Sequence, residues 1–135
     1  MSSEAKTGVV GPGGVKHMKW WGWGVDGVGF HHEGKPKFPA FVLKAVGLDL
    51  LAAVPVSEPS FVTDDLLRAI HTYGKSLRDL VRMRANLVER WVDVVVYPAD
   101  EDDVLAIVRA AVELDGVLIP FGGGSNIAGS LEPIA

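Results

Sequence analysis

The chain has 135 residues, of which 48% are hydrophobic and 22% are charged, a composition typical of a globular domain. Its formal net charge of −4 argues against a nucleic-acid-binding surface, which needs an excess of Lys and Arg. Because cysteine is absent, a disulfide scaffold, a thiolate nucleophile and a cysteine-ligated metal site are excluded. The four histidines lack metal-ligand spacing, so no metal site is predicted.

Charge is distributed unevenly along the chain. Residues 1–92 contain 12 basic and 9 acidic side chains, whereas residues 93–135 contain 8 acidic side chains and a single basic one, Arg109. This step predicts that two structural units meet near Trp91. The expected regions are a flexible N-terminus at 1–14, a Trp/Gly block with a helical region at 15–90, and a third region at 91–135.

No segment has the pattern of a membrane anchor or a secretory signal. The most apolar stretch, residues 41–56, contains Lys44, Asp49 and Pro55 and is too short to span a bilayer. Residues 1–14 lack the apolar run that a signal peptide needs. The sequence therefore predicts a cytoplasmic protein without a transmembrane segment.

Glycine motifs in the first half of the chain have different interpretations. Residues 18–24, with the sequence MKWWGWG, predict an extended, turning segment whose indole rings pack flat on another surface. Residues 22–27 match the G-x-G-x-x-G pattern, but no apolar strand precedes them, so a dinucleotide site is not expected there. Residues 74–76, with the sequence GKS, resemble the end of a phosphate-binding loop. They also lack a preceding strand and are interpreted as a link between two helices.

Three helices are predicted before the charge step. Residues 38–51 carry apolar side chains at helical spacing. Thr63 is placed to cap a short helix that ends near Gly74. Ser76 and Asp79 form the pattern of a capping box, which predicts that a further helix starts there.

The third region has the pattern of a β-α-β unit. Residues 92–97 form a β-branched run, which predicts a strand. An acidic segment at 99–103 suits a helix N-terminus, and the helical apolar period continues to residue 114. Asp115 and Gly116 end this helix, and residues 117–119 predict a second strand.

A glycine-rich loop follows the second predicted strand, and its residues are the candidate cofactor-binding residues. They are Pro120, Phe121, Gly122, Gly123, Gly124, Ser125 and Asn126. Consecutive glycines can turn sharply, and their N–H groups can converge on an anion. Arg109 is the only basic residue in this region, so a lysine or arginine clamp is not expected. From the residues alone, a diphosphate site and a ligand-free tight turn remain open alternatives.

Several of these segments, in this order, resemble one enzyme family. Residues 18–24 resemble the entry motif of alkylglycerone-phosphate (alkyldihydroxyacetonephosphate) synthases and their FAD-linked oxidase relatives. The stretch 67–84 is similar to the N-terminal helical region of that family. Residues 93–98 resemble the opening strand of its FAD-binding domain, which is of the vanillyl-alcohol oxidase / p-cresol methylhydroxylase type. Residues 120–126 resemble the pyrophosphate loop of that domain.

The resemblance implies an α+β fold and a flavoprotein. An N-terminal helical segment would be followed by the first β-α-β unit of a p-cresol methylhydroxylase-type FAD-binding domain, incomplete at the C-terminus. The implied cofactor is FAD, held through its pyrophosphate. Because the chain has no Cys, and no His after His71, FAD would be bound non-covalently at this loop.

The resemblance also implies that the chain is the N-terminal part of a longer, lipid-metabolising enzyme. The catalytic and substrate-binding residues of the family would then lie beyond Ala135, so no catalytic residue is assigned here. Two chemistries remain open, namely oxidation of a small hydroxy substrate and exchange of an acyl for an alkyl group. A complementary C-terminal chain is the expected partner. The alternative is a non-catalytic remnant or interaction module.

Overall fold

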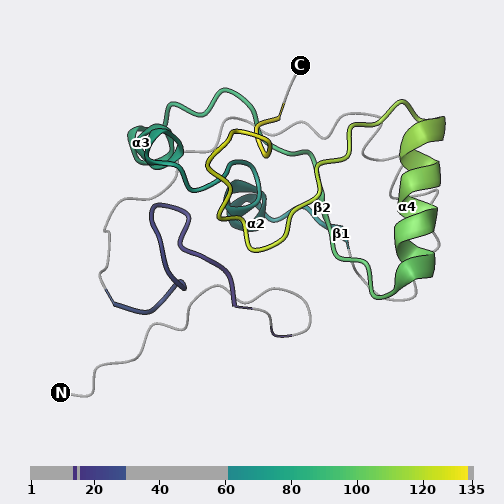
Figure 1. Cartoon of the computed structure of the whole chain (residues 1–135), viewed down its shortest axis with the longest axis horizontal. Helices are drawn as coiled ribbons and strands as arrows, with labels where there is room; N and C mark the ends of the chain where they lie inside the picture. Colours follow the sequence, from purple (N-terminus) through teal and green to yellow (C-terminus); the bar gives the residue numbers. More distant parts are fainter. Residues whose placement is uncertain (1–13, 15, 30–60, 134–135) are drawn as a thin grey trace.

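The computed structural model describes residue 14, residues 16–29 and residues 61–133. In chain order, its elements are β1 (Phe61–Val62), α2 (Asp65–Ile70), α3 (Leu77–Ala85), β2 (Val95–Val96) and α4 (Glu101–Glu113). Helices α3 and α4 lie at opposite ends of the molecule, with α2 and the two strands between them (Figure 1). The helix predicted at 38–51 lies outside the described residues.

Helix α3 begins where the capping-box pattern predicts it, and it ends at Ala85, before the apolar Leu87. The Ser76 hydroxyl accepts from the Asp79 N–H at 3.0 Å, and the Asp79 carboxylate accepts from the Ser76 N–H at 3.3 Å, which completes the capping box. At the other end, Asn86 adopts a left-handed conformation with φ 57°. The Leu87 N–H then donates to the Arg82 carbonyl at 2.9 Å, as in a Schellman motif.

Helix α4 also has the expected signals at both ends. Asp100 is its N-cap and accepts from the Asp103 N–H at 2.9 Å. Asp115, with φ 54°, follows the helix, and the Gly116 N–H donates to the Ala111 carbonyl at 2.7 Å. The predicted stop at residues 115–116 is therefore confirmed.

Helix α2 differs from the prediction at both ends. Asp64, and not Thr63, is the N-cap, because its carboxylate accepts from the Leu67 N–H at 2.9 Å. The helix ends at Ile70 with His71 as its C-cap, before the predicted end near Gly74.

The sheet confirms the α+β class but not the whole β-α-β unit. Strands β1 and β2 are antiparallel, with Phe61 opposite Val96 and Val62 opposite Val95. The predicted second strand, residues 117–119, is not a strand among the described residues. β2 instead pairs with β1, and apolar character alone does not form a strand when no described neighbour hydrogen-bonds with it.

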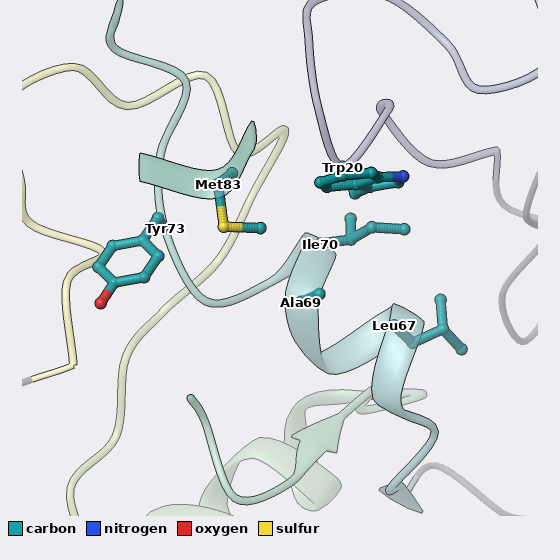
Figure 2. Packing of buried hydrophobic residues seen from close by; sticks show 6 residues of the cluster. All are labelled: Trp20, Leu67, Ala69, Ile70, Tyr73 and Met83. Atoms are coloured by element: carbon teal, nitrogen blue, oxygen red, sulfur yellow. The ribbon is translucent and has the colours of Figure 1, made fainter. Parts of the chain in front are cut away.

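The central core lies between α2, α3 and the Trp/Gly block. Its buried members are Trp20, Leu67, Ala69, Ile70, Tyr73 and Met83. Figure 2 shows the Trp20 ring lying across Ile70, so the prediction of an indole packed on another surface is confirmed for this residue. Trp23 is 59% exposed, but its indole nitrogen donates to the Lys75 carbonyl at 2.9 Å.

The Trp/Gly block folds back on itself to present Trp20 to the core. Met18 and Val25 form an antiparallel bridge. On either side of it, the Lys19 N–H donates to the Gly24 carbonyl and the Asp26 N–H donates to the His17 carbonyl, both at 2.9 Å.

A smaller apolar cluster lies under α4. Ile107 and Ala110 are buried there and pack against partly buried residues from both strands. The opposite side of the helix is apolar and exposed. This α4 outer face consists of Val104, Leu105, Val108 and Val112. Within the part of the chain that is described, no helix is long and apolar enough to cross a membrane.

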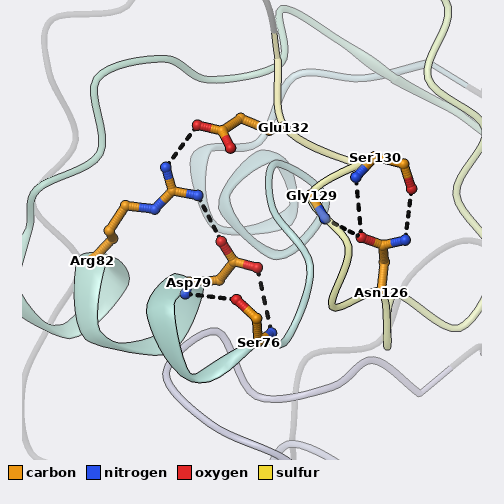
Figure 3. A network of polar contacts seen from close by, with 7 residues as sticks. All are labelled: Ser76, Asp79, Arg82, Asn126, Gly129, Ser130 and Glu132. Atoms are coloured by element: carbon orange, nitrogen blue, oxygen red, sulfur yellow. Dashed lines mark hydrogen bonds and ion pairs between the residues drawn. The ribbon is translucent and has the colours of Figure 1, made fainter.

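The C-terminal segment returns from α4 to the α2–α3 turn. The Lys75 N–H donates to the Asn126 carbonyl at 2.8 Å. Further along, Arg82 of α3 forms ion pairs with Asp79 at 2.6 Å and with Glu132 at 2.7 Å (Figure 3). The glycine-rich loop is therefore anchored to the central core.

Candidate functional site: the glycine-rich loop

The glycine-rich loop, residues 120–126, contains exposed residues whose backbone N–H groups donate no hydrogen bond. Gly122, Gly123 and Ser125 are exposed. Among the described residues, no hydrogen bond is donated by the N–H groups of 122–125. A Cβ atom at Gly122 or Gly123 would also meet nothing within 4 Å, so both backbones are open to approach. Unpaired N–H groups gathered in one turn are what an anionic diphosphate needs.

Gly124 is the glycine that the loop conformation requires. It has φ 70°, and a Cβ atom there would clash with the Phe121 ring, whose Cε1 lies at 2.9 Å, and would lie 3.3 Å from the Met18 Cε. Gly122 and Gly123 do not have positive φ. The expectation that consecutive glycines supply left-handed backbone therefore applies to Gly124 alone.

Asn126 supports the loop through its own turn. Its side-chain oxygen accepts from the N–H groups of Gly129 at 3.0 Å and Ser130 at 3.2 Å, while its amide nitrogen donates to the Ser130 hydroxyl at 2.6 Å (Figure 3). The amide is therefore engaged within the chain. The Ser125 hydroxyl, by contrast, has no hydrogen-bond partner among the described residues, so it can donate to a ligand.

The α2–α3 turn packs directly against this loop. Gly74 is in such close contact with the backbone of Asn126 that a Cβ atom would clash with the Asn126 carbonyl. Lys75 follows it and is buried, with its ammonium group donating to the Lys19 carbonyl at 2.8 Å. Residues 74–76 thus link two helices, as predicted, and also hold the glycine-rich loop.

Lys75 is a cation near the loop that the sequence did not reveal. Burial lowers the pKa of its ammonium group to about 8, against the opposing effect of the Asp79 carboxylate. Because it comes from a segment 50 residues earlier in the chain, the count of basic residues after Trp91 could not find it. The only signal for Lys75 in the sequence was the GKS pattern at residues 74–76, which resembles the end of a phosphate-binding loop.

A cluster of aromatic and histidine side chains lies behind the loop. The Tyr97 hydroxyl is 3.2 Å from His71 Nε2 and 3.4 Å from His17 Nε2. The rings of His71 and Phe121 have centroids 4.4 Å apart. Among the described residues, no group of three or more His, Asp or Glu side chains could hold a metal ion.

Electrostatics behind the loop favour neutral imidazoles. Burial is the largest cause of a lowered pKa for His71, and the nearby His17 and Lys75 add to it, while the hydrogen bond to the Leu67 carbonyl opposes it. Burial also lowers the pKa of His17. Both rings therefore act as neutral hydrogen-bonding groups at neutral pH.

The polar network of α3 fixes the other side of the turn. Burial acts to raise the pKa of Asp79, but hydrogen bonds from Arg82 and Ser76 outweigh it and lower this pKa. Asp79 is therefore a carboxylate at neutral pH. It holds the start of α3 and the Arg82 guanidinium in one arrangement.

Known proteins resemble this chain in sequence, although no family model matches it. The alkyldihydroxyacetonephosphate synthase of Dictyostelium discoideum is 42% identical over 108 residues, which are 77% of this chain and 16% of the relative. The enzyme of the same name from Trypanosoma brucei brucei is 36% identical over 101 residues, or 75% of this chain and 16% of the relative. The chain thus spans about one sixth of the length of these curated relatives.

Solved structures of the same enzyme resemble it in fold. One matches with a TM-score of 0.68 and 30% identity, over 87% of this chain and 29% of that chain. Another matches with a TM-score of 0.60 and 35% identity, over 78% of this chain and 19% of that chain.

Proposed function

We propose that this chain, an alkyldihydroxyacetonephosphate synthase-like segment in both sequence and fold, holds the diphosphate of FAD on its glycine-rich loop. The observation that carries the proposal is the row of N–H groups at residues 122–125 that donate no hydrogen bond among the described residues, three of which belong to the exposed residues Gly122, Gly123 and Ser125. These donors, together with the Ser125 hydroxyl, can surround phosphate oxygens without a basic clamp.

The residues of the site have different roles in binding the diphosphate. Gly122 and Gly123 let a diphosphate approach the backbone, and Gly124 supplies the positive φ at which the loop turns. Asn126 holds the end of the loop, and Lys75 contributes a favourable positive field from beneath. When bound, FAD supplies the flavin ring at which the chemistry of such an enzyme takes place.

Binding at this loop is non-covalent. Residues 120–126 contain no histidine, and the chain contains no cysteine, so the loop offers neither side chain for a covalent flavin link. FAD is therefore expected to leave the protein on dialysis or denaturation.

A ligand-observed titration tests this function. Adding the purified chain to FAD should broaden or shift the diphosphate ³¹P resonances, with a dissociation constant of about 1 mM, equivalent to roughly 4 kcal/mol, because only the diphosphate is held. Riboflavin and adenosine, which lack the diphosphate, should not bind at the same concentrations. Equal binding of riboflavin would contradict the proposal. So would unchanged FAD signals at a protein concentration of about 10 mM, which is ten times the expected dissociation constant.

We also propose that the α4 outer face docks on polypeptide beyond these 135 residues. Four apolar side chains line one side of the helix, and the relatives are about six times longer than the matched segment. The occupant is the rest of a flavin domain, either downstream in the same polypeptide or as a complementary chain. Completion of the domain would supply the parts of the FAD site and the catalytic residues that this chain does not contain.

The alternative of a non-catalytic interaction module shares this apolar face. It differs from the main proposal in expecting no FAD binding after the domain is completed. An FAD titration of the completed protein therefore separates the two.

A further inference from the structure

The histidine cluster behind the loop joins four segments that are distant in the sequence. His17 comes from the Trp/Gly block, His71 caps the end of α2, Tyr97 follows β2, and Phe121 belongs to the glycine-rich loop. Their mutual contacts leave the two imidazoles and the phenol buried or half-buried. Through Phe121, this cluster contacts the glycine-rich loop directly.

The hydrogen bonds of the cluster define the tautomer of each ring. His71 Nδ1 lies 2.6 Å from the Leu67 carbonyl, which can only accept, so Nδ1 carries the proton. His71 Nε2 is then an acceptor, and the Tyr97 hydroxyl donates to it at 3.2 Å. The Tyr97 oxygen remains free to accept from His17 Nε2–H at 3.4 Å. With His71 neutral, this arrangement satisfies His71 Nε2, the Tyr97 hydroxyl and His17 Nε2 together.

Phe121 connects the cluster to the shape of the loop. One side of its ring contacts His71, with centroids 4.4 Å apart. Another part of the ring occupies the place where a Gly124 side chain would lie. The backbone of Gly124, with φ 70°, thus lies against the Phe121 ring, and the same ring contacts His71.

We propose that His71, fixed by Tyr97 and His17, is a positioning residue that holds the glycine-rich loop in its binding shape and releases it on protonation. A proton on Nε2 would meet the Tyr97 hydroxyl hydrogen, so this hydroxyl would have to rotate and its hydrogen bond with His17 would have to reverse. The added charge would also face Lys75 and His17, the cationic and titratable groups that approach His71 from the following turn and from the Trp/Gly block. For its consequence on FAD, the inference rests on the proposed function.

The direction of the pH effect follows from the lowered pKa of His71. The released state takes up a proton at the ordinary value near 6.5, whereas the held state does so only at lower pH. The held state is therefore favoured above pH 6.5 and loses its advantage as the pH falls through the lower pKa of the held form.

Amide and imidazole NMR spectra of the whole chain, recorded without FAD between pH 7.5 and 4.5, test this inference. The Gly124 and Ser125 amide signals should titrate with the same midpoint as the His71 ring, below pH 6.5. In His71→Gln, the loop signals should no longer depend on pH in that range. A double substitution of the remaining histidines, His31→Gln and His32→Gln, is the matched control and should leave the wild-type midpoint unchanged.

Tyr97→Phe provides a second variant that does not depend on the stability of His71→Gln. Without the phenol donor, the neutral form of His71 loses a hydrogen bond, so the shared midpoint should rise by about half a pH unit. Loop signals that stay constant while His71 titrates would overturn the inference, as would an unchanged midpoint in Tyr97→Phe. Because no ligand is present, these outcomes are independent of whether the loop binds FAD.

Discussion

The two apolar clusters of this molecule differ in how completely they are closed. The central core receives side chains from α2, α3 and the Trp/Gly block, and the C-terminal segment is bound to its edge by Arg82. The cluster under α4 has two buried residues, and the opposite side of that helix remains exposed, with Val112 at 77%. The central core is therefore covered by several segments, whereas α4 leaves a second apolar surface exposed, as its proposed docking role requires.

Truncating the central core should produce the largest effect. Ile70 is 2% exposed and lies beneath the Trp20 ring, so Ile70→Ala should lower the free energy of unfolding by about 2–5 kcal/mol. Ile127→Ala is the matched control because Ile127 is 76% exposed, and its effect should stay within about 0.5 kcal/mol. Urea denaturation of the two variants measures the difference, and equal losses would show that the core is elsewhere.

Substitution of the loop glycines should give the next largest effect. Gly124→Ala forces a side chain into the Phe121 ring at positive φ and should cost roughly 1–3 kcal/mol. Gly123→Ala enters open space without that backbone strain and should cost less than about 1 kcal/mol. Thermal unfolding of both variants compares them. If Gly123→Ala were the more damaging, this description of the loop would be wrong.

Removing the charge of Asp79 should have a smaller effect. Asp79→Asn weakens the capping box and the Arg82 ion pair, which should cost about 1–2 kcal/mol at pH 7. Since the pKa of Asp79 is lowered from 3.8, its contribution is present above that value and is lost as the pH falls through the folded-state pKa. Asp102→Asn, at an exposed position of α4, is the control. Plotted against pH, the free energies of unfolding of wild type and Asp79→Asn should converge at acid pH.

Charging the α4 outer face should change stability least of all. Val108→Lys combined with Val112→Lys should alter the free energy of unfolding by less than about 0.5–1 kcal/mol, because both side chains are exposed. Self-association, measured by sedimentation velocity, should nevertheless decrease, and binding of a complementary flavin-domain chain should be lost. Wild-type behaviour in both assays would contradict a docking role for this face.

Local sequence predicted what local interactions determine. Ser76 and Asp79 lie three residues apart, and the Asp115–Gly116 pair follows the C-cap of α4, so their patterns identified the start of α3 and the end of α4. The position of the glycine-rich loop and its glycines was likewise evident from adjacent residues. These signals depend on hydrogen bonds between near neighbours in the chain.

Contacts between distant segments were not predictable in the same way. Tyr97 meets His17 across 80 positions, and a helix-linking lysine is packed beneath a loop that follows it by 50 residues. The prediction of a strand at residues 117–119 was wrong for a related reason. A strand requires a hydrogen-bonding partner strand, which no local pattern specifies. The histidine cluster behind the loop was therefore visible only in the three-dimensional structure.

FAD is proposed to bind to the backbone N–H groups of the glycine-rich loop. Amide spectra of the ¹⁵N-labelled chain, titrated with FAD at pH 7.5, test it most directly. We predict progressive shifts at Gly122, Gly123, Gly124 and Ser125, and none along the α4 outer face. The same titration of Gly124→Val should abolish these shifts. Shifts confined to α4, or identical shifts in wild type and Gly124→Val, would contradict the account.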